Sequence, residues 1–342
     1  MTRLGVAIKQ MTRLTDDEQA DLMRLAARLG YESAWTPAPA ALERDAFQIC
    51  LRWWEAARAV RGGMTVGIAV VPLPFWTVPA LAVAAGTLAS MTGGRFILGV
   101  GPSAIHIPSF RARYGVARVS PVELVRDHLR ALRPMLRGDH VSNDGATLRL
   151  ADAWLAFHAP AVPLYMSAMG PRMLELAGEL SDGVCLNWCT TDEIARSRAT
   201  VEVAAVGAKR PTGSVQVVQS IRVSLDPDPE VARRRLARTI LHYALARPGS
   251  SPERGYRGHF ARMGFDARLR ALERMREEGA SDAVLADAFP AEVLSDLAYF
   301  GVAAGARSAV ERLSRGLDLA LIRPVVAPGD AAGVAAVFEA CA

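Results

Sequence analysis

The stretch "PLYMSAMGPRMLELAGELSDGVCLNW", residues 163–188, places one helical pattern between two short apolar runs. Pro171 suits the first turn of that helix, because its missing N–H would have no partner there. Gly170 permits either an ordinary tight turn or a close approach of the main chain to a flat surface. The stretch predicts a strand, a helix over 171–180 and a second strand, which is the repeating unit of a parallel sheet.

The same unit recurs along the chain. Strand-like apolar runs occupy residues 4–8, 33–36, 65–71, 96–101, 164–167, 183–188, 214–225 and 319–326. Short, all-apolar strands that alternate with helices indicate a parallel sheet covered on both faces. Eight such units close into a (β/α)8 TIM barrel, an α/β fold, and an open doubly wound sheet is the alternative. The polar, helical residues 226–306 predict an insertion between strands 7 and 8, and "HVSNDGATLRL" (140–150) predicts a surface hairpin.

Several helix ends can be predicted from capping residues. Asp45 and Ser120 precede helical patterns over 46–60 and 121–136 as N-caps, and Gly30 follows another as a C-cap. "GVGPSA", residues 99–104, matches a dinucleotide-binding pattern, but it follows the fourth strand and "IHIPSF" does not resemble a helix start. We therefore do not expect an NAD-type Rossmann site.

Composition excludes several classes of protein. The chain has 342 residues and a formal net charge of +5, and its basic residues are arginines apart from Lys9 and Lys209. The run "RRRLAR" (233–238) has no interleaved aromatic residues, so we read it as a solvated helix face and expect no nucleic-acid partner. The uncharged stretch 62–94 is interrupted by prolines and predicts no membrane span. Four cysteines without paired spacing and the lack of a leader-like apolar segment indicate a cytoplasmic protein.

In a barrel, chemistry takes place at the carboxyl ends of the strands. The residues there are mostly small or aromatic, with few ionisable groups. The chain has no His-Glu-x-x-His motif, no carboxylate cluster and no Gly-x-Ser-x-Gly motif, so metal-dependent and acyl-transfer chemistry lack candidates and no metal is expected. Such a rim suits a planar cofactor that brings its own reactivity.

The segments "GRFILGVGPS", "VPALAVAAGTLASMTGGRF" and residues 163–188 resemble the bacterial luciferase-like superfamily. They are most similar to its coenzyme F420-dependent branch, which includes methylenetetrahydromethanopterin reductase and F420-dependent glucose-6-phosphate dehydrogenase. The resemblance covers essentially the whole chain. It implies one luciferase-like TIM-barrel domain over residues 1–342, with the helical insertion at about 226–306. It also implies an oxidoreductase that moves a hydride between the deazaflavin and a small organic substrate.

The resemblance also implies where the cofactor lies. The third strand of the family ends in a bulge, often with a non-proline cis peptide, and the main chain after the fifth strand approaches the ring. The cofactor phosphate is expected where strand six meets its helix. The residues implied to bind the cofactor are Trp35, Ala69, Val70, Val71, Ser167, Ala168, Met169, Gly170, Pro171, Asn187, Trp188, Thr190, Thr191 and Arg323.

The chain departs from this branch at the expected proton-transfer residues. No ionisable residue follows the second strand until Glu43, and the loop after the fourth strand, "PSAIHIPSF", has no carboxylate. His106 and Lys9 remain as catalytic candidates, although each is equally well read as a residue without a catalytic role. Phe75 and Trp76 are expected to cover the substrate side or to pack.

Two other functions stay open. One is an FMN-dependent monooxygenase that uses reduced flavin and O2, and the other is a catalytically silent flavin-binding barrel. A separate flavin or F420 reductase is a further expected partner. The resemblance, together with the apolar helix that contains Trp53 and Trp54, predicts a homodimer.

Overall fold

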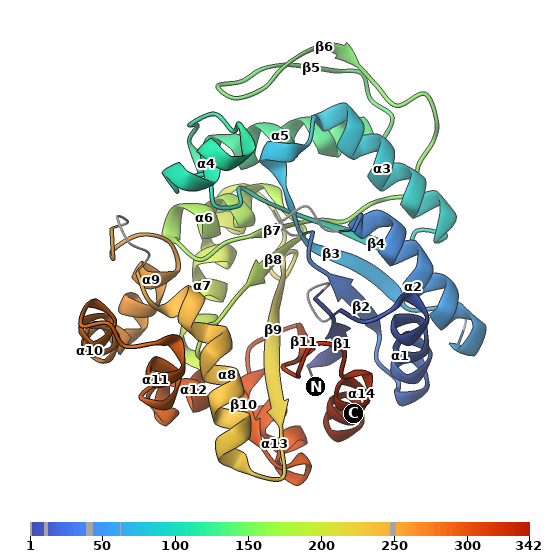
Figure 1. Ribbon diagram of the computed structural model, residues 1–342. Coiled ribbons are helices and arrows are strands. Elements are labelled where there is room, and N and C mark those ends of the chain that lie inside the picture. The colour runs from blue at the N-terminus through green and yellow to red at the C-terminus, as the bar shows by residue number, and fades with distance from the viewer. Residues whose placement is uncertain (1, 10–12, 39–43, 62, 247–250) are drawn as a thin grey trace.

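Eight parallel strands form the centre of the molecule, and helices surround them (Figure 1). The computed structural model describes residues 2–9, 13–38, 44–61, 63–246 and 251–342. The barrel strands are β1 (Arg3–Ala7), β2 (Ser33–Thr36), β3 (Thr65–Pro72), β4 (Phe96–Gly101), β7 (Leu164–Ser167), β8 (Gly183–Leu186), β9 (Gln216–Leu225) and β11 (Leu319–Pro324). They pair in the order β9-β11-β1-β2-β3-β4-β7-β8, and a pairing of β8 with β9 closes the ring. The (β/α)8 barrel is confirmed, and an open sheet is excluded.

The helices around the barrel begin and end where capping chemistry favours it. They are α1 (Asp16–Leu29), α2 (Ala46–Arg61), α3 (Val78–Met91), α5 (Pro121–Leu136), α6 (Pro171–Leu180), α7 (Thr191–Gly207), α13 (Ala306–Leu313) and α14 (Ala331–Cys341). Asp45 accepts a hydrogen bond from the Gln48 N–H at the start of α2, and Ser120 caps α5 in the same way. Gly30 ends α1 with φ of 90°, a left-handed conformation that glycine adopts without a steric cost.

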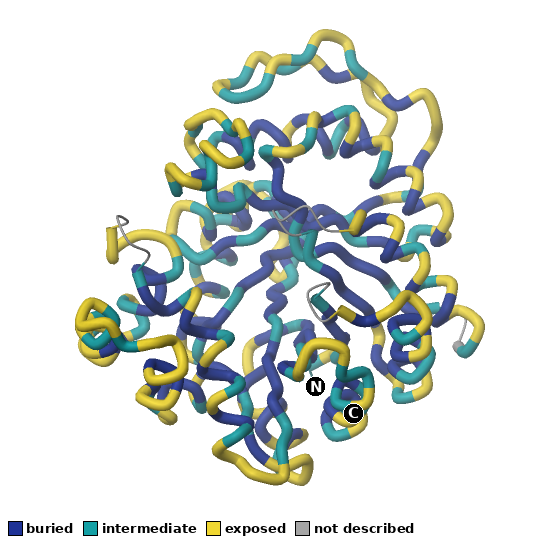
Figure 2. The backbone as a smooth tube through the Cα atoms, in the orientation of Figure 1, coloured by how far each residue is buried: buried dark blue, intermediate teal, exposed yellow. Residues whose placement is uncertain are grey.

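The barrel interior is filled by side chains that point inward from alternate positions of the strands. Trp35, Tyr165 and Leu321 belong to one buried apolar cluster inside the ring. Figure 2 shows the strands as buried and the outer faces of the helices as largely exposed. The interior is therefore a packed floor, and any cavity has to lie above it, at an end of the barrel.

Between β9 and β11 the chain builds a cluster of short helices with a core of its own. They are α8 (Pro229–Ala244), α9 (Gly255–Phe260), α10 (Asp266–Glu277), α11 (Asp282–Asp287) and α12 (Ala291–Leu297), followed by the short strand β10 (Tyr299–Gly301). Leu236, Phe260 and Phe289 are central to this core, and Trp188 from the barrel packs into it. The cluster therefore lies against the barrel at the loop after β8.

The segment after β4 differs from the sequence-based expectation. "IHIPSF" was expected not to begin a helix, but α4 (Pro108–Tyr114) begins within it. No side chain caps this helix, so Pro108 in its first turn is the signal in the sequence for its start. It is held instead by contacts of Phe110 and Tyr114 with Phe75.

The hairpin predicted over 140–150 is confirmed. β5 (Val141–Asp144) pairs antiparallel with β6 (Arg149–Ala153), and Figure 1 shows the pair projecting beyond α3 and α5. Within the uncharged stretch, residues 65–91 form β3, a short 3-10 turn and α3. Among the helices of the described residues, none combines the length and apolar character that a bilayer crossing needs.

Candidate functional site

A cavity of about 1150 Å³ opens at the carboxyl ends of the barrel strands. The ends of β3, β7, β8, β9 and β11 contribute to its wall, together with the loop after β4 and the segment around α9. Pockets of several hundred to about 1,000 Å³ are typical of cofactor and substrate sites, and this end of the barrel is where enzymes with this fold bind their ligands. The cavity is the candidate active site.

The end of β3 has the irregular backbone that the resemblance implies. The pairing of β3 with β4 changes register between Ile68 and Val71, and the peptide bond from Ala69 to Val70 is cis. Ala69 and Val70 line the cavity. Val71 lies in the apolar layer outside the barrel and is fully buried.

The segment after β7 forms another part of the wall. Ser167, Ala168, Met169 and Gly170 all line the cavity. Gly170 is the N-cap of α6 with φ of –104°, a conformation open to any residue, and a Cβ built there would meet no atom within 4 Å. Neither backbone conformation nor packing requires a glycine at this position, so the open space belongs to the cavity.

Several residues of the implied cofactor set do not reach the wall. Trp35 and Trp188 are buried, Trp35 in the barrel floor and Trp188 against the α8–α12 cluster. The Thr190 hydroxyl accepts a hydrogen bond from the Glu193 N–H and caps α7. Pro171 and Thr191 begin α6 and α7 and, like Val71, are outside the cavity lining. Of the residues expected near the cofactor phosphate, Asn187 and Arg323 line the cavity, whereas Thr190 and Thr191 do not.

The wall is more positively charged than the strand ends suggested. Six arginines line the cavity, and no Asp or Glu is among the described residues that do so. The arginines are Arg111, Arg118, Arg254, Arg257, Arg262 and Arg323. The strand ends themselves carry few ionisable groups, and five of the six arginines come from loops and helices beyond them. A wall of this charge favours an anionic ligand.

The two catalytic candidates lie in different surroundings. His106 lies on the wall, in the loop between β4 and α4, and faces Gly255. Lys9 follows β1, outside the cavity lining, and its Nζ donates to the Tyr243 hydroxyl across 3.5 Å. Burial, and next the charge of Arg323, lowers the pKa of the Lys9 ammonium.

Asn187 connects the wall to a buried arginine that sequence reasoning missed. Asn187 Nδ2 donates to the Tyr256 hydroxyl across 2.6 Å, and Arg222 Nη2 donates to Asn187 Oδ1 across 2.7 Å. The Arg222 guanidinium is stacked over the Trp188 ring, 3.5 Å from its centroid. Burial and Arg323 lower the pKa of Arg222 to about 9. A charged residue inside a strand of a parallel barrel was the signal that could have identified this group.

Two aromatic expectations are settled by packing. Trp76 packs on Phe47, and Phe75 packs on the rings of α4. Neither residue lines the cavity, so both pack against other side chains and do not cover the substrate side. Trp53 is buried in the core, where its indole N–H donates to Gln19 Oε1 across 3.2 Å.

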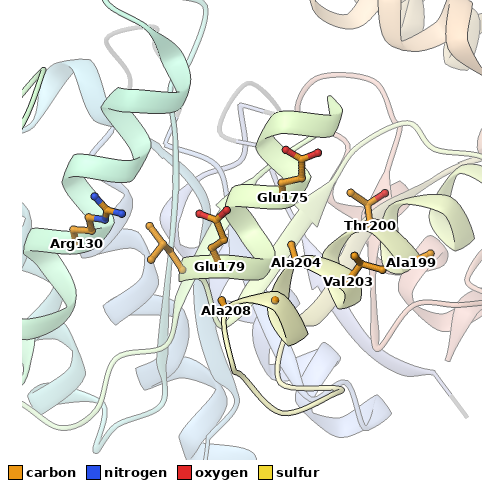
Figure 3. Close-up of a pocket in the computed structure, with 10 residues that line it drawn as sticks. Arg130, Glu175, Glu179, Ala199, Thr200, Val203, Ala204 and Ala208 are labelled. Carbon is orange, nitrogen blue, oxygen red and sulfur yellow. The ribbon is translucent and has the colours of Figure 1, made fainter.

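A second cavity, of about 980 Å³, lies on the outer helical layer. Figure 3 shows Arg130 on one side, with Glu175, Glu179 and residues of α7 on the other. No strand end and no aromatic side chain contributes to its wall. It is a surface groove between helices and has none of the features of the barrel site. No cluster of three or more potential metal ligands occurs in the part of the chain that the structure describes.

Comparisons with known proteins agree with the barrel and with the resemblance. A family model described as luciferase-like monooxygenase matches residues 2–317. The 5,10-methylenetetrahydromethanopterin reductase of Methanolobus tindarius is 36% identical over 148 residues, which are 43% of this chain and 44% of that protein. An F420-dependent glucose-6-phosphate dehydrogenase of Mycobacterium avium is 31% identical over 198 residues, 53% of this chain and 56% of that protein. The chain thus spans about half the length of the curated relatives it matches.

Solved structures show the same fold over the full length. The coenzyme F420-dependent tetrahydromethanopterin reductase of Methanopyrus kandleri has a TM-score of 0.77 and 18% identity, covering 99% of this chain and 98% of that one. An F420-dependent secondary alcohol dehydrogenase, solved with an F420-acetone adduct, has a TM-score of 0.74 and 17% identity, covering 100% and 99%. At these identities the similarity establishes the architecture alone.

Proposed function

Because this chain belongs to the luciferase-like monooxygenase family, we propose that it is an oxidoreductase that binds coenzyme F420 in the barrel cavity. It would transfer a hydride between the deazaflavin and a small organic substrate. The relatives named above are F420-dependent enzymes or reductases, which supports this choice of cofactor. The observation that carries the proposal is the cavity itself, large, at the catalytic end of the barrel and lined by six arginines without a carboxylate among its described lining residues.

The residues of the wall fit a planar, anionic cofactor. The irregular turn at Ala69 and Val70 and the main chain of Ser167 to Gly170 would face the ring system, and Gly170 leaves room for it. The exposed arginines Arg118, Arg254 and Arg262 would hold the anionic part, since a guanidinium presents several donors to phosphate or carboxylate oxygens. We therefore assign the phosphate to this arginine-lined side of the cavity and not to the start of α7.

The chain itself would bind and orient the cofactor and the substrate, exclude water and exchange a proton. When bound, F420 supplies the carbon that accepts or donates the hydride. The apolar part of the wall, which includes Val70, Val218 and Leu321, would keep water away from the reacting atoms. His106, on the same wall, remains the candidate for proton exchange with solvent.

A titration of cofactor-free protein with F420 and, separately, with FMN tests the proposal. Ring fluorescence of each compound reports binding. We expect saturable binding of F420 and much weaker binding of FMN. Tight FMN binding without F420 binding would overturn the proposal in favour of the FMN-dependent monooxygenase, and binding of F420 without turnover of any alcohol or enone substrate would favour a silent barrel.

A further inference from the structure

Tyr243 occupies a defined place on the cavity wall. It lies near the C-terminal end of α8, and the ammonium group of Lys9 donates to its hydroxyl across 3.5 Å. The ring packs edge-on against Tyr256, with 4.7 Å between centroids, and lies 5.8 Å from the Trp188 ring. Packing on these rings and the contact with Lys9 hold the side chain of Tyr243 in place on the cavity wall.

Among the described residues, the charged groups that act on Tyr243 are cations: Lys9, Arg222 and Arg323. The titratable Tyr256 packs on its ring, and His106, His242, Cys185 and five further arginines line the same cavity. Burial disfavours the phenolate of Tyr243, but Lys9, Arg222 and Arg323 outweigh burial and lower its pKa to about 8. Tyr243 is the tyrosine of this cluster whose pKa is lowered, so its phenolate would compensate the three neighbouring cations.

The neighbouring Tyr256 provides a contrast within the same wall. Its hydroxyl accepts a hydrogen bond from the Asn187 amide, where that of Tyr243 accepts one from the Lys9 ammonium. Burial and the neighbouring Tyr243 raise the pKa of Tyr256 to about 12. The pKa values of two tyrosines in edge-to-face contact thus differ, with that of Tyr243 lowered and that of Tyr256 raised. Neighbouring groups whose pKa values are shifted in opposite directions are typical of a proton-transfer residue beside a structural one.

We propose that Tyr243 is the residue that exchanges a proton with an oxygen of the ligand in the cavity, and that Lys9 positions its hydroxyl and stabilises its phenolate. As phenolate, Tyr243 takes the proton of a ligand O–H group, and the electron pair of that bond stays on the ligand oxygen. As phenol, it returns the proton to an oxygen that carries negative charge. The substrate class is therefore a small alcohol or carbonyl compound.

This inference rests on the proposed function, because the hydride would come from bound F420. The ionisation of Tyr243 itself needs only the residues of this chain. Tyr243 would take the role of a proton-transfer carboxylate, which the loop after β4, "PSAIHIPSF", does not contain. A base of this kind is active above its pKa and an acid below it. Alcohol oxidation should therefore rise with pH through about 8, and carbonyl reduction should fall there.

The direct test is ionisation of the tyrosines in cofactor-free protein, followed by phenolate absorbance in the near ultraviolet as pH is raised. We expect one tyrosine to ionise near pH 8 in the wild type, and this step to disappear in Tyr243→Phe and persist in Tyr256→Phe. No ionisation near that pH, or the same step in Tyr243→Phe, would overturn the inference. The wild-type measurement decides even if a variant fails to fold.

Lys9 variants separate positioning from a merely structural role. In Lys9→Met the ionisation of Tyr243 should move to higher pH, because the neighbouring positive charge is lost. In Lys9→Arg, which keeps the charge, the ionisation should stay near pH 8. An ionisation at unchanged pH in Lys9→Met would refute the role of Lys9. With an F420-dependent substrate in hand, Tyr243→Phe should lower kcat by roughly 100- to 10,000-fold without changing F420 affinity. If the ionisation appears but F420 does not bind, the proposed function fails and the proton site stands.

Discussion

At the scale of single residues, Gly170 connects the sequence most directly to the proposed site. Its φ of –104° does not require glycine, and a Cβ there would contact nothing within 4 Å. A glycine at a helix N-cap, where Ser, Asp or Asn would do as well or better, is explained if a ligand occupies the adjoining space. Gly178, in the same helix, differs, because a Cβ there would collide with the Val201 carbonyl of α7.

The variant Gly170→Asn tests this explanation. Asparagine is a good N-cap, so thermal unfolding should be unchanged or slightly improved. Its side chain would enter the space next to the cavity, and F420 binding should weaken by about tenfold or more, which corresponds to ~1.4 kcal/mol. The control Gly178→Ala should lower the melting temperature without altering the shape of the site. Unchanged F420 affinity in Gly170→Asn would remove Gly170 from the site.

Sequence reasoning found the residues whose role is local and missed those whose role depends on distant contacts. The segments at Ala69–Val70 and 167–170 lie on the wall as expected, because each follows directly from its strand. Tyr243 was missed because its contact with Lys9 joins positions 234 residues apart. Thr190 was assigned to a phosphate although its hydroxyl caps α7, a use that the sequence "TTDE" allows equally well.

At the scale of elements, Arg257 joins α9 to α10. Its guanidinium is almost fully buried and donates to Glu273 across 2.9 Å and to Asp266 across 2.9 Å. The same Glu273 accepts the Ala246 N–H at the end of the segment after α8. Because α9, α10 and the segment after α8 meet at this ion pair, it fixes the part of the helical cluster that carries Arg254 and Tyr256.

Removing the buried partner should therefore destabilise the helical cluster. Arg257→Leu leaves Glu273 buried without its cation, and we expect a loss of about 3 kcal/mol in the free energy of unfolding. The exposed pair of Arg268 and Glu292 gives a matched control, since Arg268→Leu should cost no more than about 1 kcal/mol. Equal losses for the two variants, measured by denaturant unfolding, would contradict the structural role of Arg257.

Element boundaries were predictable where local chemistry sets them. The helices 121–136 and 171–180 match their predicted bounds, because Ser120 caps the first and a proline stands in the first turn of each. α4 was missed because packing of its aromatic residues on Phe75, and not a cap, stabilises it. Tertiary contacts of this kind leave no periodic signal in seven residues.

At the scale of the whole molecule, the expected homodimer needs an apolar surface. Trp53, one of the two tryptophans behind that expectation, is already covered by the chain's own core. α3 provides another candidate, because Val83 and Met91 are 49% and 51% exposed on it, and Phe157 packs across Gly86 of the same helix. Exposed apolar side chains gathered on one helix are typical of an interface.

A charge placed on α3 should separate the subunits. We expect wild-type protein to sediment as a dimer at micromolar concentration and Val83→Arg to sediment as a monomer, because a buried unpaired charge is costly at an interface. Val302→Arg, after β10, where the valine is 45% exposed and lies on neither helix, is the control and should remain dimeric. A wild-type monomer would rule out the dimer, and a dimeric Val83→Arg variant would place the interface elsewhere.

A crystal structure of the protein with F420 bound tests most directly whether the barrel cavity is a deazaflavin site. The tricyclic ring should lie between the turn at Ala69–Val70 and the main chain of Met169–Gly170, with its anionic tail toward Arg118, Arg254 and Arg262 and the Tyr243 hydroxyl facing the substrate space beside the ring. Density for the ring outside this cavity, or an empty cavity at saturating F420, would contradict the assignment.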